Sequence, residues 1–415
     1  MNEQEKVNHG PILLAPPAPR RVIGLDAHPD TFTAIRLRGY TPFDAITEKT
    51  FHKVPLSQLE AWAKKHTSPE EEIVLEAGGN SFQIQRTLEG LGRNAKVLES
   101  GQIGKLKAAY ANNDKISALR IAKAYLTGTA KVVWVPDPLT QERRDLWHAY
   151  RKSVKRATRA RNSLQSYLSD HGARFKKKEL TQGKEAEERI KQARSWSSME
   201  WQVIEGLLLE LRHTHQQRAH WRSLIALQVA QDEKLLALVR LCGVRDLVAF
   251  AVGAIVGDIG RFQSPKSLVN YVGLSPAFDD SGKSESEGGV GHHGRRDLRN
   301  ILVEAAQSIM RSPTSALAKW GKKLLARTGQ LSLVVAAVAR RLTVAIWYLL
   351  MGRWTPLEEI DARLEQKLSS IITQIGKERL EKLNKSRQDF RQAMKEALKK
   401  KIYLLDRERL FTMPA

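Results

Sequence analysis

Residues 139–235 contain no proline and very few glycines, and their apolar residues recur at helical spacing. This pattern predicts two long helices, at about 146–168 and 199–231, separated by a polar break near 172–183. Helices of that length bury an apolar stripe against each other or against a second chain. We therefore expect residues 138–235 to form a helical hairpin or coiled-coil linker that dimerises.

Residues 21–137 carry a different pattern, in which strand signals alternate with helix signals. The segments RVIGLDA (21–27) and EEIVLEA (71–77) are short apolar runs, and TFTAIRLR (31–38) alternates with a period of two. Three early strands followed by alternating helices and strands predict an α/β domain around a mixed sheet. This is the element order of an RNase H-like fold.

The rest of the chain reads as helical or irregular. Residues 236–353 are rich in small residues, with Gly-Val turns between helical segments, and are predicted to form an all-α domain. The sequence TPLE (355–358) is a capping box with proline at the first helical position, so a charged helix is expected to run to about Lys401 within a tail at 354–415. The proline-rich residues 1–20 predict a disordered tail.

Two features predict a soluble protein of the cytoplasm with no membrane partner. The start of the chain lacks the charged-then-apolar order of a signal peptide. The most apolar later stretch, residues 331–352, is interrupted by Arg340 and Arg341, which favours a buried helix over a membrane span. The single cysteine, Cys242, excludes an intrachain disulfide and is consistent with a reducing compartment.

The charge balance predicts a polyanionic partner. Lysine and arginine total 68 against 45 acidic residues, which gives a formal net charge of +23. Nucleic acid is the commonest polyanion that such a charge attracts, although a ribosomal or membrane-surface protein could share it.

Three carboxylates near the start of the chain suit a divalent metal. Asp26 and Glu76 each follow an apolar strand, and Asp114 begins a helix. Strand ends and a helix start can converge in an α/β domain, and carboxylate oxygens are ligands for Mg²⁺ or Mn²⁺. The alternative gives the three residues ordinary roles as a turn aspartate, a surface glutamate and a helix cap.

A basic helix face is the first candidate for contact with nucleic acid. Its members recur at three- and four-residue spacings: Arg151, Lys152, Lys155, Arg156 and Arg159. Like charges at four-residue spacing repel by roughly 0.2–0.5 kcal/mol per pair, and a bound phosphate backbone would remove that cost. The alternative is a face that contacts only solvent.

A serine in a loop of Asp, Ser, Gly and Glu is the candidate nucleophile. Ser281 precedes the segment HHGRRDLRN, whose basic side chains could hold a phosphate and stabilise the charge that develops during attack. These side chains are His292, His293, Arg295, Arg296 and Arg299. Most serines in such loops are merely solvated, because a serine hydroxyl needs activation to act as a nucleophile.

The order of these motifs resembles that of insertion-sequence transposases with an N-terminal DEDD (RuvC-like) domain, relatives of the Piv DNA invertase, some of which are guided by a bridge RNA. GLDAHPDTFTAIRL resembles the first acidic strand of that family, VLEAGGN its glutamate segment, and NDKISALRIA its paired-aspartate helix. GDIGRFQSPKSLVNYVGLSP and the later GHHGRRDLRNILVEAA resemble its C-terminal transposase domain. The resemblance covers about residues 21–353.

The resemblance implies a DNA recombinase or transposase. It implies that the front domain binds Mg²⁺ or Mn²⁺ through Asp26, Glu76 and Asp114, and that Ser281 forms a covalent phosphoserine link to DNA. It further implies donor and target DNA and a noncoding guide RNA as partners. A homo-oligomer, dimer or tetramer, would let the metal site and the serine meet.

The sequence departs from the family pattern at two places. The paired-aspartate motif is D-x-x-D, and Ser117 stands at its second position. His292 and His293 stand where the family carries a lysine-rich pair. These departures leave two alternatives open: a metal-dependent nuclease or junction resolvase without a covalent serine step, and a catalytically inactive relative that binds nucleic acid.

Overall fold

A computed structural model describes residues 19–105, 113–181, 184–281, 284–290, 294–353 and 361–399. The chain divides into two compact units, Met1–Pro136 and Asp137–Ala415. Hydrophobic clusters fill each unit separately, so each has a core of its own.

The first unit is built on a six-stranded mixed sheet in the order β3-β2-β1-β4-β5-β6. β1 pairs with β2 in antiparallel and with β4 in parallel orientation, so the two types of pairing meet at β1. The predicted α/β domain with a mixed sheet in RNase H-like order is confirmed. The strands are β1 Arg20–Ala27, β2 Thr31–Gly39, β3 Ile46–Pro55, β4 Glu72–Glu76, β5 Asn94–Leu98 and β6 Val132–Val133.

Helices cover both faces of this sheet and bury the alternating apolar residues of its strands. The helices are α1 Leu59–His66, α2 Ser81–Gly90, α3 Ser100–Lys105 and α4 Asp114–Leu126. Ile23 and Leu25 of β1 belong to the cluster that α1 and α2 cover, whereas Val22 belongs to the cluster on the α4 side. Successive side chains of a strand point to opposite faces, so β1 contributes to both cores.

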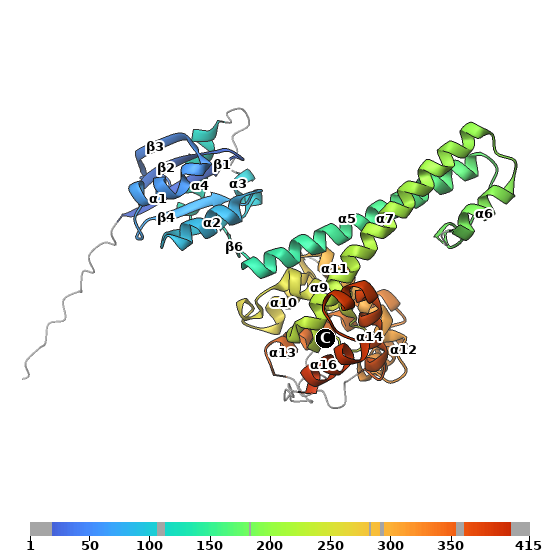
Figure 1. The fold of residues 1–415 in the computed structure, drawn as a ribbon. Helices are drawn as coiled ribbons and strands as arrows, with labels where there is room; N and C mark the ends of the chain where they lie inside the picture. Colours follow the sequence, from blue (N-terminus) through green and yellow to red (C-terminus); the bar gives the residue numbers. More distant parts are fainter. Residues whose placement is uncertain are drawn as a thin grey trace, which may run out of the picture. The chain divides into compact units, whose positions relative to one another are not determined.

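The second unit begins with a long helical hairpin of α5 (Pro138–Asp170) and α7 (Ser198–Gln231), which lie side by side in Figure 1. Leu164 and Leu168 of α5 and Ile204 and Leu208 of α7 are buried in one cluster between them. The apolar stripe predicted from the sequence is therefore covered within the chain. Dimerisation through this element stays a prediction.

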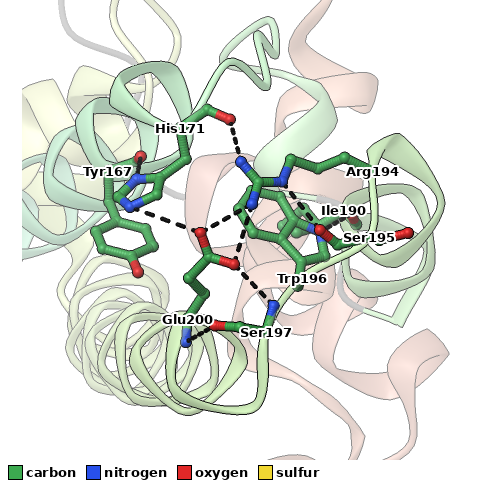
Figure 2. Close-up of polar contacts among 8 residues, drawn as sticks. All are labelled: Tyr167, His171, Ile190, Arg194, Ser195, Trp196, Ser197 and Glu200. Atoms are coloured by element: carbon green, nitrogen blue, oxygen red, sulfur yellow. Dashed lines mark hydrogen bonds and ion pairs between the residues drawn. The ribbon is translucent and has the colours of Figure 1, made fainter.

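Polar contacts tie together the end of the hairpin, where α6 (Lys184–Ala193) joins α5 to α7 (Figure 2). Glu200 accepts hydrogen bonds from the backbone N–H of Ser197 at 2.7 Å and from Arg194 at 2.8 Å. Arg194 also donates to the carbonyl oxygen of His171 at 2.8 Å. A capping box of Ser197 and Glu200 thus fixes the start of α7, and Arg194 links it to the end of α5.

Helices of 6 to 20 residues pack around the base of the hairpin to form the largest core. They are α8 Glu233–Leu238, α9 Asp246–Val256, α10 Pro265–Val272, α11 Arg296–Met310, α12 Ala316–Thr328 and α13 Leu331–Leu350. The region is largely helical, as predicted, but it also contains an antiparallel pair of strands, β7 (Pro276–Ser281) and β8 (Ser284–Val290). The sequence predicts a turn there, because Asp, Ser and Gly are depleted in strands. The cross-strand backbone pairing overrides that preference.

Within the described residues, α13 is the helix long and apolar enough to cross a membrane. Val334, Val338, Leu342 and Ile346 are buried in the C-terminal core, and the helix packs against α10, α11 and α12. The Arg341 guanidinium lies 3.9 Å from the ring centroid of Trp320. The apolarity of α13 is thus explained by its place in the core.

Three helices follow where the sequence predicts one charged helix, and the TPLE box at 355–358 lies outside the described residues. The helices are α14 Leu364–Ile375, α15 Lys377–Lys382 and α16 Arg387–Lys399. The breaks fall at Gly376 and Asn384, which have φ of 84° and 51° and so leave the helical region. Leu368, Ile372 and other apolar residues of these helices belong to the C-terminal core.

Candidate functional site

Asp26 and Glu76 stand at matching ends of two neighbouring parallel strands. β1 and β4 pair in register through Leu25 and Leu75, and each acidic residue follows directly. Leu25 and Leu75 point into the cluster covered by α1 and α2. Because side chains alternate along a strand, both carboxylates point to the opposite face, which α4 covers.

Asp114 is the first residue of α4, and Gly24 brings that helix close to β1. Asn113 caps the helix, because its side-chain oxygen accepts a hydrogen bond from the backbone N–H of Ile116 at 2.8 Å. A Cβ added at Gly24 would lie 2.0 Å from the carbonyl oxygen of Ala118 in α4. Only glycine permits this approach, which carries the start of α4 toward the end of β1.

The resulting cluster consists of Asp26, Asp114 and His28. One ligand atom from each side chain lies within 4.8 Å of the other two. The Nε2 atom of His28 is 3.6 Å from Oδ2 of Asp26 and 3.3 Å from Oδ1 of Asp114. Two carboxylates and an imidazole are donors that a divalent metal ion accepts.

Backbone contacts hold His28 in the turn between β1 and β2. Its N–H donates to the carbonyl oxygen of Thr31 at 2.8 Å. Its own carbonyl oxygen accepts a hydrogen bond of 2.9 Å from the side chain of Asn80, the residue before α2. The turn that carries His28 is therefore fixed by both neighbouring segments.

Two positions that the sequence assigns to the metal site, Glu76 and Ser117, are not members of this cluster. Glu76 shares the strand-end position but is not among the three side chains that meet within 4.8 Å. Ser117 follows Asp114 by one helical turn on α4 and is partly buried. Sequence reasoning missed His28, although the available signal was a histidine two residues after Asp26, in the turn that follows β1.

Ser281 is the last residue of β7, where it pairs with Ser284 of β8. The side chains of residues 276–293 are not described, and His292 and His293 lie outside the described residues. The segment that follows β8 returns against the end of α10: a Cβ added at Gly294 would lie 2.6 Å from the backbone nitrogen of Gly273. Gly294 is thus packed closely against the end of α10.

The three arginines after this hairpin have different surroundings. Arg295 donates to Asp297 at 3.0 Å, and its backbone N–H donates to the carbonyl oxygen of Tyr271. Burial alone would lower the pKa of Arg295, but the hydrogen bond to Asp297 outweighs it and the pKa is raised, so the group stays cationic. Arg299 donates to the carbonyl oxygen of Gly273 at 3.1 Å, whereas Arg296 is exposed. Arg295 and Arg299 therefore join the start of α11 to the end of α10.

The basic face predicted at 151–159 lies on α5. Ser153, Ala157 and Ala160 are buried on one side of the helix. The predicted cations lie on the other sides, with Arg151 partly exposed and the rest exposed: Lys152, Lys155, Arg156 and Arg159. Arg151 is 3.9 Å from Asp297, so this end of the basic face lies beside the start of α11.

Comparison with known proteins adds a family match. Residues 236–320 match the model of the transposase IS116/IS110/IS902 family. The chain is similar to transposases of this group. The matched segment contains β7, β8 and α11, and therefore Ser281 and the three arginines.

Individual relatives carry related names. A putative transposase, y4qE, from Sinorhizobium fredii is 25% identical over 64% of this chain, and the alignment spans 64% of that protein, less than two thirds of its length. The transposase of insertion sequence element IS1111A from Coxiella burnetii is 25% identical over 68% of this chain and 78% of its own. A pilin gene-inverting protein from Moraxella lacunata is 28% identical over 25% of this chain and 33% of its own.

Proposed function

We propose that this protein is a transposase, a site-specific DNA recombinase that cuts and rejoins DNA through a covalent link to Ser281. The observation that carries the proposal is the match of residues 236–320 to a transposase family, because this segment contains Ser281. The net charge of +23 and the relatives named as transposases support DNA as the substrate.

The proposed metal site lies in the first unit. Asp26 and Asp114 would hold Mg²⁺ or Mn²⁺, with Glu76 beside Asp26 at the strand ends, and their carboxylate oxygens fit either ion. A bound divalent cation would offset the negative charge of the scissile phosphate. Ser117 supplies a hydroxyl in place of a fourth carboxylate, so we expect weaker binding than in a site with four acids.

The proposed covalent step uses Ser281. Its Oγ attacks the phosphorus of a phosphodiester, a bond from Oγ to phosphorus forms, and the bond from phosphorus to the leaving deoxyribose oxygen breaks. The serine proton is lost to a base and the leaving oxygen gains a proton, so the charge on the phosphate is unchanged. The phosphoserine link keeps the bond energy for rejoining, and the exposed Arg296 is available to contact the phosphate.

Binding of nucleic acid is assigned to the basic face of α5, whose exposed cations can contact a phosphate backbone without reading sequence. We propose a noncoding guide RNA as a second partner, on the strength of the motif resemblance. A homo-oligomer is supported by apolar residues exposed on α7, of which Met199 is 78% and Leu209 67% exposed. The protein would act in the cytoplasm, where its DNA substrates are.

A second candidate is a metal-dependent nuclease or junction resolvase. It is favoured by the position of the Asp26–His28–Asp114 cluster, which lies wholly within the first unit and needs no residue from the segment around Ser281. A catalytically inactive relative that binds nucleic acid is the third, and Ser117 is the residue that favours it.

A reconstituted reaction separates these candidates. The purified protein is mixed with donor and target DNA and Mg²⁺ or Mn²⁺, with and without RNA transcribed from the flanking sequence, and the products are sequenced. Recombinant junctions that are lost in Ser281→Ala and kept in Ser284→Ala support the recombinase. Cleavage that persists in Ser281→Ala supports the nuclease, and binding without any product supports the inactive relative.

A further inference from the structure

The imidazole of His28 contacts both carboxylates of the proposed metal site. Its Nε2 atom lies 3.6 Å from Asp26 and 3.3 Å from Asp114. The three ligand atoms all lie within 4.8 Å of one another. The side chain of His28 is 46% exposed, so the cluster is open to solvent and an ion can reach it.

We propose that His28 is a nitrogen ligand of this metal site and that the site selects a divalent transition-metal ion such as Mn²⁺ over Mg²⁺. The inference rests on the metal site of the proposed function and assigns it a ligand outside the acidic set. It also names the class of ion that the site prefers.

The geometry fits direct ligation by all three side chains. Ligand atoms about 2.1 Å from an octahedral ion are about 3.0 Å apart when adjacent and about 4.2 Å apart when opposite. The Nε2 atom of His28 lies 3.3 Å from Asp114, near the adjacent spacing, and 3.6 Å from Asp26, between the adjacent and the opposite spacing. The third separation, between Asp26 and Asp114, is at most 4.8 Å, so side-chain rotations that change these separations by less than about 1 Å would bring the three atoms onto one ion.

The position of His28 is set before any ion binds. Hydrogen bonds with Thr31 and Asn80 fix its backbone on both sides, so the imidazole needs only side-chain adjustment to act as a ligand. A donor that is already in place loses little freedom on binding.

The donor set decides which ion is preferred. Mg²⁺ takes oxygen ligands and gives up its water reluctantly, whereas imidazole nitrogen is a better donor to transition metals. Ser117, one helical turn after Asp114, offers a neutral hydroxyl and not an anionic oxygen, and His28 adds a neutral nitrogen. Both changes lower the advantage of Mg²⁺ at this site.

A competing role for His28 makes the opposite prediction. A protonated imidazole between two carboxylates would act as a cation in place of a metal ion and would have to be displaced. Removal of His28 would then tighten metal binding, whereas removal of a ligand weakens it. The sign of the change in affinity therefore decides between the two roles.

The test measures binding of Mn²⁺ and Mg²⁺ separately to the full chain by titration calorimetry, and records the electron spin echo envelope modulation of bound Mn²⁺. The variant is His28→Ala. The matched control is His52→Ala, which removes an exposed histidine of β3 in the same unit, whose Nδ1 lies 3.4 Å from Thr33 Oγ1.

We expect strong ¹⁴N modulation from Mn²⁺ in the wild type and in His52→Ala, and its loss in His28→Ala. Loss of even an outer-shell partner costs roughly 10–100-fold in metal affinity, so the Mn²⁺ affinity should fall at least about tenfold. The Mg²⁺ affinity should change by less than about threefold, because Mg²⁺ relies on oxygen ligands.

The failures are distinguishable. Mn²⁺ that binds the wild type without ¹⁴N modulation, or more tightly to His28→Ala, overturns the role of His28 and leaves the metal site of the proposed function intact. Absence of Mn²⁺ and Mg²⁺ binding in the wild type overturns both.

Discussion

The substitution Gly24→Ala should move Asp114 of α4 away from Asp26 of β1, although Gly24 itself is not part of the proposed metal site. The added Cβ would lie 2.0 Å from the carbonyl oxygen of Ala118 and 2.8 Å from the backbone nitrogen of Ala122. Both atoms belong to the backbone of α4, so no side chain can rotate away. An ordinary contact begins near 3.4 Å, so α4 and β1 must move apart by about 1.4 Å.

The displacement has two consequences of predictable size. Overpacking of this kind costs about 1–3 kcal/mol of unfolding free energy. Metal–ligand distances tolerate shifts of only about 0.2 Å, so the movement of Asp114 away from Asp26 should weaken Mn²⁺ binding at least about tenfold. Both effects come from a residue that offers no ligand atom.

Gly90→Ala is the matched control, because a Cβ at this last residue of α2 meets nothing within 4 Å. Hydrogen exchange of peptides from β1 and α4 reports local stability, and titration calorimetry reports Mn²⁺ affinity. We expect faster exchange and weaker binding in Gly24→Ala alone. Wild-type exchange and affinity in Gly24→Ala would refute the close packing of α4 on β1.

Three further predictions follow from other parts of the fold. Burial alone would raise the pKa of Glu72, but hydrogen bonds from Lys96, Tyr125 and Arg20 outweigh it and lower the pKa from 4.5 to about 2. The contribution of Glu72 to the free energy of unfolding is therefore present above about pH 4.5 and is lost as the pH falls toward 2. Urea titrations over that range should show the wild type losing about 1–2 kcal/mol more unfolding free energy than Glu72→Gln, after allowance for solvent screening. Equal losses in the two proteins would contradict this prediction. Met199→Glu combined with Leu209→Glu should shift the oligomer toward monomer in light scattering, since both side chains are exposed and apolar, and an unchanged mass would exclude this face. Lys367→Met leaves the 8%-exposed carboxylate of Asp361 unpaired, which should cost about 3–5 kcal/mol in thermal unfolding and be partly restored by adding Asp361→Asn; no change in either variant would contradict the pairing.

The regular elements could be predicted because their signals are local and repetitive. The absence of proline from 139–235 and the helical spacing of residues such as Leu164 and Leu208 are sufficient to predict the α5–α7 hairpin. β1 and β4 could be predicted as short apolar runs, and β2 from its alternation with a period of two. The sequence did not predict which surface covers the long helices, because an apolar stripe can pack against a second chain as well as against another helix of the same chain.

The misses arise where tertiary contacts override local preference. β7 and β8 form from Asp, Ser and Gly residues that individually disfavour strands, through backbone pairing across the hairpin. The charged tail breaks at Gly376 and Asn384 because its apolar residues reach the core only when the chain turns. The many charged residues of this segment made its apolar face difficult to recognise in the sequence.

Part of the candidate site could be predicted because some of its residues stand next to strands or helices that have local sequence signals. Asp26 and Glu76 could be placed from their strand ends, and Asp114 from its helix start. His28 was missed because a histidine in a turn has many roles, and its contact with Asp114 spans 86 residues of sequence. Proximity of that kind depends on Gly24, whose effect on helix packing cannot be read from the sequence alone.

The central claim is that Ser281 carries the DNA during recombination. The most direct measurement is mass spectrometry of protease digests after reaction with donor and target DNA, guide RNA and Mn²⁺, quenched in denaturant. We expect a peptide that contains Ser281 and carries a nucleotide phosphate, absent from Ser281→Ala and retained in Ser284→Ala. Recombinant DNA formed by the Ser281→Ala protein, with no nucleotide-linked peptide in the wild type, would contradict it.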